Sequence, residues 1–402
     1  MTKPDVLIIG GGMVGLTLAL LLAQRDFFNI TLVETMPLPP LNVDEPLPYR
    51  PSFDARNTAL SRKTVSTYQD LGLWDALQTH ATPIHHIHIS EQGGFGIARL
   101  HAQEEQVESF GQVIENAWLG LVLLRAVKAN SAIRVLDGAT LTKLTIDQTQ
   151  ATATVSYQGQ EQQLCAPLLI AADGADSVCR QLLGVMASSH DYQQTALVTT
   201  VATHLPHQQT AFERFTHSGP LALLPLPDNR RSIVWTLPKG EEDALINCSD
   251  EQFLAGLQKA FGNRAGKFIR TGKRFAYPLK QVLAQSQALP RAVILGNAAH
   301  SLHPVAGQGF NLCVRDCLAL TERLQTQVQQ QSDIGDLAIL ENYQQARLTD
   351  QQRVIRFCDG VVKGFSNRQP VLRLARNIGL LAFDLVPHAK QTVANYAMGL
   401  RV

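Results

Sequence analysis

The stretch Pro4-Asp-Val-Leu-Ile-Ile-Gly-Gly-Gly-Met-Val-Gly-Leu-Thr-Leu-Ala-Leu-Leu-Leu-Ala23 decides the fold. Its apolar start leads into Gly10-x-Gly12-x-x-Gly15, and a Leu/Ala-rich segment with helical spacing follows. This pattern is typical of a strand that turns sharply into a helix. Gly10 permits the tight turn, Gly12 lets a pyrophosphate approach the backbone, and Gly15 lets the helix pack closely on the strand. The unpaired N–H groups and the dipole at the helix start favour phosphate binding there.

An acidic residue strengthens this prediction. Ile30-Thr-Leu-Val-Glu34 has the pattern of a second strand, and Glu34 lies 19 positions after Gly15. In a dinucleotide-binding fold, an acid at this place accepts hydrogen bonds from ribose hydroxyls. The sequence therefore predicts a dinucleotide site on this strand, turn and helix.

The same stretch has two other interpretations. Residues 6–23 carry no charge over 18 positions, which is long enough for a membrane span. The bunched glycines and the acids Asp5 and Glu34 at the flanking strand ends favour a buried strand and helix instead. A secretory signal is disfavoured because Lys3 is offset by Asp5 and no credible cleavage site precedes the motif.

Composition describes an ordinary soluble enzyme. The 402 residues are 45% hydrophobic and 17% charged with a net charge of +1, which gives no global attraction to nucleic acid. Residues 351–402 differ, because eight Lys/Arg against two Asp/Glu give them +6. Six cysteines without C-x-x-C spacing indicate reduced thiols in the cytoplasm. Cys313 and Cys317 lie one helical turn apart, and buried small side chains are favoured over a metal or redox pair.

Two further strand-to-helix turns are predicted. An apolar run over residues 164–172 leads into Asp173-Gly174 and then a helix. A second run over residues 292–295 leads into Gly296-Asn297, a Gly-rich segment and a long helix from about residue 309 to 328. Each turn would direct backbone N–H groups at one ligand edge. Three such turns in one Rossmann-type sheet imply a large cofactor.

The remaining segments predict a second, mainly antiparallel β layer. Short β-rich runs split by turn signals fill residues 185–280, with one helix near 250–261, and a hairpin around Gly93-Gly94 follows Pro83. The predicted fold class is α/β, with a Rossmann-type domain, an inserted antiparallel β domain and a helical C-terminal region. The expected boundaries are 1–80, 110–184 and 281–340 for the first domain, 81–109 and 185–280 for the second, and 341–402 for the C-terminal helices.

Several histidines crowd the predicted hairpin. Their spacing places them on both strand faces, and no carboxylate or cysteine set accompanies them, so no metal site is expected. They are His80, His85, His86, His88 and His101.

The three turns together resemble the class A flavoprotein monooxygenases, the p-hydroxybenzoate hydroxylase-like group, over most of the chain. The resemblance implies FAD as cofactor, with its ADP half held by the first turn and Glu34. It also implies that NAD(P)H binds transiently, and no second G-x-G-x-x-G is present for a resident nicotinamide. The residues expected to bind the cofactor are Gly10, Gly12, Gly15, Glu34, Arg56, Asp173, Gly174, Gly296, Asn297, Pro304, Gly307, Gln308, Gly309 and Asn311.

Two positions depart from the family pattern. The family's last acidic residue, which bonds the ribityl chain of FAD, falls on Asn297, whose amide can still accept a hydrogen bond but carries no charge. The helix near residue 116 begins Asn116-Ala-Trp-Leu-Gly-Leu, so the polar contact usual at its start stays unassigned.

A closer resemblance is to the ubiquinone-biosynthesis hydroxylases. It rests on Phe53-Asp-Ala-Arg-Asn-Thr-Ala-Leu60, Ala211-Phe-Glu-Arg-Phe-Thr-His-Ser-Gly-Pro-Leu-Ala-Leu-Leu-Pro225, Gly272-Lys-Arg-Phe-Ala-Tyr-Pro278, Gly296-Asn-Ala-Ala and Arg376-Asn-Ile-Gly-Leu380. It implies an NAD(P)H- and O₂-consuming ring hydroxylation of a polyprenylated phenol, 2-polyprenyl-6-methoxyphenol. Hydroxylation at another ring carbon and a non-catalytic flavin- or isoprenoid-binding scaffold remain as alternatives. No catalytic base is assigned; the candidates on the phenol side are His303, Gln308 and the residues near Glu213-Arg214-Phe215.

The basic C-terminal segment has two interpretations. Residues 371–386 are too short and too charged to span a membrane, but residues 365–402 could lie on acidic headgroups or on another ubiquinone-biosynthesis protein. A helix packed on the FAD-binding domain is slightly favoured. The expected location is the cytoplasm, with the inner face of the membrane as the alternative.

Overall fold

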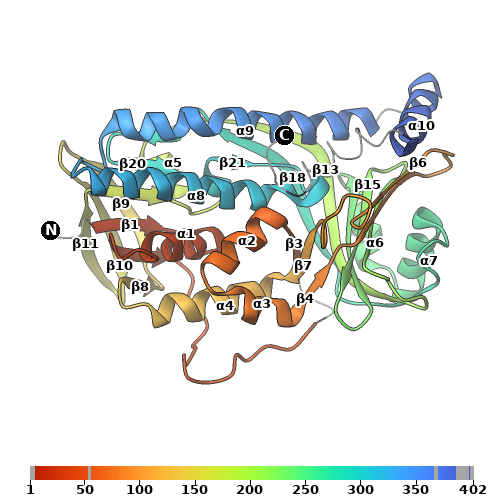
Figure 1. Ribbon diagram of the computed structural model, residues 1–402, viewed down its shortest axis with the longest axis horizontal. Coiled ribbons are helices and arrows are strands. Elements are labelled where there is room, and N and C mark those ends of the chain that lie inside the picture. Colours follow the sequence, from red (N-terminus) through yellow and green to blue (C-terminus); the bar gives the residue numbers. More distant parts are fainter. Residues whose placement is uncertain (1–4, 53–55, 366–369, 386–397, 399–402) are drawn as a thin grey trace.

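A computed structural model describes residues 5–52, 56–365, 370–385 and 398 of the chain. Figure 1 shows a sheet with helices at one end of the molecule, a second sheet at the other end, and two long helices along the top. The predicted α/β class, with a Rossmann-type sheet, an antiparallel β layer and a helical C-terminal region, is confirmed.

The first sheet has six strands in the order β19-β20-β12-β1-β2-β8. All neighbours are parallel except β19 and β20. Because β20, β12 and β1 are neighbouring parallel strands, their carboxyl ends lie side by side at one edge of the sheet. The strands are β1 (Asp5–Ile9), β2 (Asn29–Glu34), β8 (Ile133–Asp137), β12 (Leu168–Ala171), β19 (Ala288–Leu289) and β20 (Ala292–Ile294).

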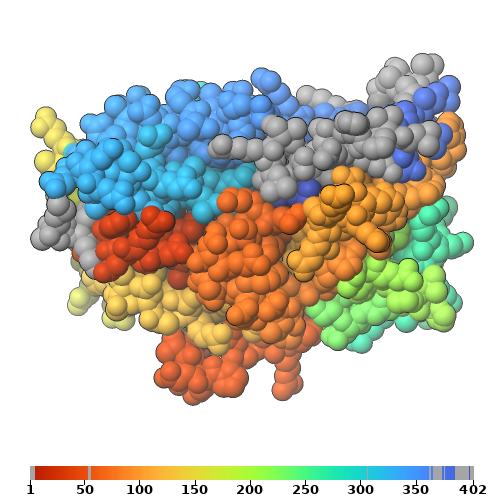
Figure 2. All heavy atoms as spheres, in the orientation of Figure 1, coloured from red at the N-terminus to blue at the C-terminus, as the bar shows by residue number. Residues whose placement is uncertain are grey.

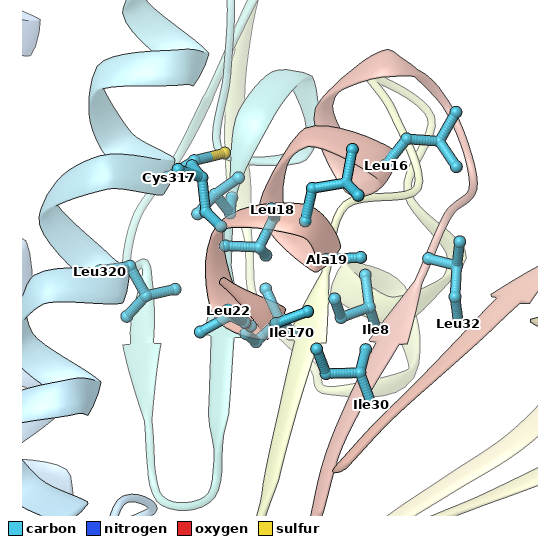
Figure 3. Packing of buried hydrophobic residues seen from close by; sticks show 14 of the residues in the cluster. Ile8, Leu16, Leu18, Ala19, Leu22, Ile30, Leu32, Ile170, Cys317 and Leu320 are labelled. Atoms are coloured by element: carbon cyan, nitrogen blue, oxygen red, sulfur yellow. The ribbon is translucent and has the colours of Figure 1, made fainter. Parts of the chain in front are cut away.

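Both faces of this sheet are buried, which explains its uninterrupted apolar runs. Ile8 faces a core formed with α1 (Met13–Ala23), α4 (Asn116–Ala129) and α8 (Gln308–Gln329). Figure 3 shows this core, where Leu18 and Leu22 of α1 lie between the strands and Leu320 of α8. The opposite face packs on a three-stranded antiparallel sheet of β9 (Thr140–Ile146), β10 (Ala151–Tyr157) and β11 (Gln160–Ala166).

The second large sheet has nine strands in the order β21-β18-β13-β16-β15-β14-β5-β6, with β17 paired to β13. It is antiparallel except for the β14–β5 pair. Two helices, α6 (Glu242–Asn247) and α7 (Asp250–Phe261), pack on one face. The strands are β5 (His86–Glu91), β6 (Ile97–His101), β13 (Ala187–Thr203), β14 (Thr210–Phe215), β15 (Pro220–Leu226), β16 (Arg230–Pro238), β17 (Phe268–Thr271), β18 (Phe275–Ala284) and β21 (His300–Ser301).

A small sheet lies between the two large ones. Its order is β3-β7-β4, and β4 and β7 also lie against β15. Its strands are β3 (Asn57–Ser61), β4 (Ala81–Pro83) and β7 (Gly111–Glu115). Between β3 and β4 the chain forms α2 (Arg62–Asp70), α3 (Trp74–Leu77) and the short helix η1 (Gln78–His80).

The C-terminal helices corrected one expectation. Helix α9 (Leu337–Phe365) lies along α8, but α10 (Pro370–Leu385) packs on strand β6 of the nine-stranded sheet and not on the first sheet. In Figure 2 the blue atoms of α10 lie against the orange atoms of the β5–β6 hairpin. Polar contacts explain why α10 packs on this hairpin. Asn377 accepts a hydrogen bond from Gly96 N at 2.7 Å, and Arg376 pairs with Glu91 at 2.6 Å.

Glycines in the hairpin permit this docking. A Cβ atom on Gly94 or Gly96 would lie 2.3 or 2.5 Å from the nearest atom of Asn377, closer than real contacts allow. The hairpin predicted around Gly93-Gly94 therefore also forms the surface on which α10 packs. Across the described part of the chain, no helix is long and apolar enough to cross a bilayer.

Candidate active site

The first glycine turn is held by its own backbone. Gly10 has φ +113°, and a Cβ there would lie 2.4 Å from the carbonyl oxygen of Ala172. A Cβ on Gly15 would lie 1.9 Å from the carbonyl oxygen of Gly10, so helix α1 leaves the strand with no room for a side chain. Gly12, in contrast, has no atom within 4 Å of its Cβ position. The space in front of Gly12, at the start of α1, is therefore open to a ligand.

Glu34 lies at the tip of β2, next to this turn. One carboxylate oxygen accepts a hydrogen bond from Gly11 N at 2.6 Å, and the other accepts one from Met36 N at 2.8 Å. A carboxylate offers about four lone-pair sites, so these two bonds leave capacity for a ribose hydroxyl. The residue thus fixes the glycine turn and still presents an acceptor at the sheet edge.

The second turn follows β12 and uses its acid internally. Asp173 accepts hydrogen bonds from Ser177 Oγ at 2.6 Å and from Cys179 N at 2.9 Å. Ser177 in turn caps α5 (Val178–Leu182) by accepting from Arg180 N at 2.9 Å. Gly174, with φ +89°, completes the turn. Both oxygens of Asp173 therefore hold this turn in shape.

Direct contacts bring the three predicted turns together. The second turn adjoins the first, because Ala172 contacts Gly10. Arg180 connects the second turn to the third by donating to Ala175 O at 2.8 Å and to Ala298 O at 2.7 Å. The third turn, η2 (Gly296–Ala298), packs on Val14 of α1, 3.1 Å from the Cβ position of Gly296.

A buried charge network supports the third turn from behind. Asp316 of α8 is 1% exposed and accepts hydrogen bonds from His300 Nε2 and from Arg347 Nε of α9, both at 2.5 Å. Burial alone would raise the pKa of Asp316, but His300 and Arg347 lower it below its ordinary value. Arg347 also pairs with Asp350, and Arg315 pairs with Asp350 at 2.9 Å. The network fixes His300, three residues after Asn297, against α8 and α9.

The segment after the third turn leads into helix α8. It passes His303 and Pro304, forms η3 (Val305–Gly307), and begins α8 at Gln308. Asn311 is hydrogen-bonded on all sides: its Oδ1 accepts from Ser61 N and Thr64 Oγ1, and its Nδ2 donates to Ala59 O and Gly307 O. Asn311 therefore joins α8 to strand β3 and helix α2.

A cavity of about 630 Å³ lies between this segment and the nine-stranded sheet. Six of the predicted cofactor residues line it: Asn297, Pro304, Gly307, Gln308, Gly309 and Asn311. Its opposite wall is mostly apolar and comes from strands β5, β6, β14, β15 and β16. The other predicted residues, Gly10, Gly12, Gly15, Glu34, Arg56, Asp173, Gly174 and Gly296, do not line it. Arg56 is exposed and lies over the Tyr277 ring at 5.5 Å.

Two titratable side chains line the cavity among the described residues, His303 and Glu213. His303 is 1% exposed, and burial lowers its pKa to about 4, so it is neutral at pH 7. Its Nδ1 accepts a hydrogen bond from Val305 N at 3.3 Å, which assigns the proton to Nε2. This Nε2–H has no partner among the described residues. Glu213 lies on β14, and burial raises its pKa to about 7.

The C-terminal lining of the cavity was not predicted from the sequence. Val361 of α9 and Leu380 and Phe383 of α10 border it. The apolar spacing of α10 predicted an amphipathic helix, but only its docking on the β5–β6 hairpin shows which space that helix covers. Thr236 of β16 was also missed, and no sequence signal distinguishes it from other strand residues.

The residues present fit FAD. Helices α2, α5 and α7 begin with serines whose side chains cap them, whereas α1 and α8 begin at Gly12 and Gly307 without a side-chain cap. Gly12 and Gly309 both face open space at these helix starts. The first site suits a pyrophosphate and the second a polar ring edge, and the apolar cavity continues beyond the second.

Comparisons of the sequence agree with this geometry. The FAD binding domain family matches residues 3–358. The ubiquinone hydroxylase UbiL of Rhodospirillum rubrum is 33% identical over 395 residues, which cover 98% of this chain and 89% of that protein. The 3-demethoxyubiquinol 3-hydroxylase of Escherichia coli is 32% identical over 399 residues, which cover 98% of each chain.

Solved structures share the fold. The p-nitrophenol 4-monooxygenase PnpA from Pseudomonas putida superimposes with a TM-score of 0.79 at 15% identity, covering 100% of both chains. PqsL from Pseudomonas aeruginosa, a probable FAD-dependent monooxygenase, gives a TM-score of 0.75 at 19% identity, covering 94% of this chain and 100% of that one. At such identities the likeness concerns the fold alone.

Proposed function

The chain belongs to the FAD binding domain family and is an FAD-dependent monooxygenase, and from this premise we propose that it hydroxylates the ring of 2-polyprenyl-6-methoxyphenol. The relatives that it matches are hydroxylases and monooxygenases of ubiquinone biosynthesis, which supports the same function for this chain. One observation carries the finer proposal: an apolar cavity of about 630 Å³ begins at the third glycine turn and ends under a C-terminal helix. Such a cavity suits an aromatic ring with a hydrocarbon substituent.

The division of labour follows from chemistry. Bound FAD, reduced by NAD(P)H, supplies activated oxygen, which protein side chains cannot supply. The protein positions the ring and excludes water. We assign the ADP half of FAD to Gly10, Gly12, Gly15 and Glu34, its pyrophosphate surroundings to Arg56, Asp173 and Gly174, and its ribityl chain and ring to Gly296, Asn297, Pro304, Gly307, Gln308, Gly309 and Asn311.

The domain boundaries belong to the same proposal. Every strand of the first sheet falls within residues 1–80, 110–184 and 281–340, the segments assigned to the FAD-binding domain. Strands of the nine-stranded sheet fall within 81–109 and 185–280, apart from the end of β18 and strand β21.

Turnover of a soluble analogue tests the function. Purified protein loaded with FAD is given O₂, NADH or NADPH, and 2-methoxyphenol carrying a five-carbon prenyl group at position 6. The expected result is one hydroxylated product for each NAD(P)H oxidised. NAD(P)H oxidation that yields only hydrogen peroxide with every phenol would contradict the proposal and favour a non-catalytic scaffold.

A second candidate is hydroxylation at another ring carbon. The relative from Escherichia coli carries the name of a 3-hydroxylase, and its identity to this chain, 32%, is nearly that of the Rhodospirillum rubrum protein. The intermediate that accumulates in a strain lacking this gene distinguishes the two, because its ring substitution identifies the missing step.

We also propose that α10 contacts an acidic lipid surface while the phenol loads. Leu374, Ile378 and Leu381 are 53%, 53% and 38% exposed and lie on one helix face, since their spacing is four and three residues. Leu380 and Phe383 of the same helix line the cavity. The charge of +6 over residues 351–402 favours acidic headgroups.

Vesicle flotation tests this contact. The full chain should float with vesicles containing phosphatidylglycerol more than with neutral vesicles. A variant with Leu374→Ser, Ile378→Ser and Leu381→Ser should lose the difference. Equal flotation of both proteins on both vesicles would contradict the membrane proposal and leave the hydroxylase proposal untouched.

A further inference from the structure

Among the described residues that line the cavity, Glu213 brings the one carboxyl group, and it lies on the apolar wall. Side chains alternate along β14, so Ala211, Glu213 and Phe215 share the face that lines the cavity. Phe212 also borders the cavity, but it packs with Phe261 of α7 on the other face. Arg214, on that same other face, donates to Ala260 O of α7 at 3.2 Å. The pleat of the strand therefore directs Glu213 into the cavity.

The surroundings of Glu213 are apolar on each side. Its register partners are Ile89 on β5 and Ala222 on β15, and both line the cavity. Within the described part of the chain, no group forms a hydrogen bond or ion pair with its carboxyl. The residue is of intermediate exposure because it borders the cavity, while protein atoms otherwise surround it. An acid placed this way without a partner is costly for the fold, which indicates a functional use.

Charged groups near Glu213 are already paired or turned away. On the same sheet face, Glu91 of β5 pairs with Arg376 of α10 at 2.6 Å. Arg214 lies on the opposite face and donates to Ser90 Oγ. Asp384 of α10 accepts from Arg99 N at 2.8 Å. Across the cavity, His303 is neutral and presents a proton at Nε2.

We propose that Glu213 is a catalytic residue: its carboxylate accepts the phenolic proton of the substrate. The inference rests on the proposed hydroxylase function and deepens it by naming the base. The substrate O–H bond breaks as the proton moves to the carboxylate, and the electron pair stays on the phenolate oxygen, so no electrons are exchanged. The charge makes the ring carbons electron-rich, and the carboxyl returns the proton to the product oxygen or to water.

The environment of Glu213 suits this step. An ordinary glutamate has a pKa of 4.5 and a phenol one near 10, a mismatch of roughly five to six units. Burial raises the pKa of Glu213 to about 7, which reduces the mismatch to about three units. His303 cannot take this role, because its lowered pKa makes it a poor base and its Nδ1 is already an acceptor.

The first test compares hydroxylation by the wild-type holoenzyme, Glu213→Gln and Glu213→Asp, with 2-methoxy-6-prenylphenol as substrate. Wild-type product formation should rise with pH around the pKa of about 7, because only the ionised carboxylate accepts a proton. Glu213→Gln should be about 10²- to 10⁴-fold slower and lack that rise, and Glu213→Asp should keep part of both. A ring-fluorinated phenol that is already ionised should restore much of the rate of Glu213→Gln.

A second measurement does not depend on turnover. The pKa of folded Glu213, about 7, lies above its ordinary value of 4.5, so the unfolded chain releases the proton first as pH rises. Thermal unfolding should therefore show wild type losing stability relative to Glu213→Gln between those two pH values. Glu161→Gln, an exposed glutamate of β11, is the matched control and should show no such trend.

The outcomes are distinct. A wild-type enzyme that hydroxylates phenols while Glu213→Gln keeps its rate and pH profile would overturn the inference alone. A stability difference that does not change with pH would also overturn it, because Glu213 would then not titrate in this range. If wild type hydroxylates no phenol, the proposed function fails and the inference fails with it.

Discussion

Two desolvated acids in this molecule, Asp316 and Glu213, have opposite surroundings. Asp316 accepts hydrogen bonds from His300 and Arg347, and its pKa is lowered. Glu213 faces an apolar cavity, has no partner in the part of the chain that the structure describes, and has its pKa raised to about 7 by burial. Both cost desolvation free energy, but only Asp316 recovers it from neighbouring charges. The difference indicates that Asp316 holds the fold, whereas Glu213 is kept ready for a ligand.

Removing the carboxylate of Asp316 should cause the largest change in the free energy of unfolding. Asp316→Asn leaves Arg347 and His300 buried beside a neutral amide, and we expect a loss of about 3–5 kcal/mol in the free energy of unfolding. Urea titration measures it. Because the folded pKa of Asp316 is below its ordinary value of 3.8, its contribution is present above that pH and is lost as pH falls, so the difference between the two proteins should shrink in acid.

A matched control is available at another Asp–Arg pair. Asp333→Asn removes the carboxylate that pairs with Arg291, but the Asp333 side chain is 46% exposed, so we expect a loss of about 0–1 kcal/mol in the free energy of unfolding. If Asp316→Asn lowered the free energy of unfolding no more than Asp333→Asn does, Asp316 would not be a residue that stabilises the fold.

Loosening the helix that covers the cavity should lower the pKa of Glu213. Asn377 donates to Glu91 at 2.5 Å and accepts from Gly96 N, so Asn377→Ala should cost about 1–3 kcal/mol of α10 docking. Hydrogen exchange of the α10 amides should become faster. Water then reaches Glu213, and the midpoint of its pH-dependent stability should move from about 7 toward 4.5.

The control for this change is Asn247→Ala. Asn247 donates to Asp243 O within α6 and does not line the cavity, so it should affect neither α10 exchange nor the titration of Glu213. An unchanged midpoint in Asn377→Ala would show that α10 does not keep water from Glu213.

The smallest expected effect is an increase in the free energy of unfolding, where the other substitutions lower it. Glu213→Leu replaces a desolvated acid by an apolar side chain in an apolar wall, and it should raise the free energy of unfolding by about 1 kcal/mol at pH 8. Differential scanning calorimetry of wild type and variant, with the flavin bound, measures the change. A lower Tm in Glu213→Leu would mean that the carboxylate has a stabilising partner after all.

The sequence predicted the three strand-to-helix turns, which are contiguous in the chain and which the structure contains. The first turn, Asp173-Gly174 and Gly296-Asn297 each combine a strand end with a helix start, so local pattern was sufficient. The contrast between the two acids could not be predicted. His300, Asp316 and Arg347 come from three elements, and the face to which β14 directs Glu213 depends on its neighbours β5 and β15.

The covering helix was the part of the site least accessible to sequence reasoning. Asn377 has no signal of its own, and its role depends on the absence of side chains at Gly94 and Gly96, almost 300 residues earlier. The apolar spacing of α10 indicated a buried face, but not that the face would border a cavity beside the predicted flavin site.

The position of α10 in the chain has a consequence for biosynthesis. All the strands that line the cavity, and the turn that borders it, leave the ribosome before this helix does. Domains fold from the N-terminus as the chain is made. During translation, the cavity therefore lacks this wall until α10 has left the ribosome, and it is open to small molecules at that stage.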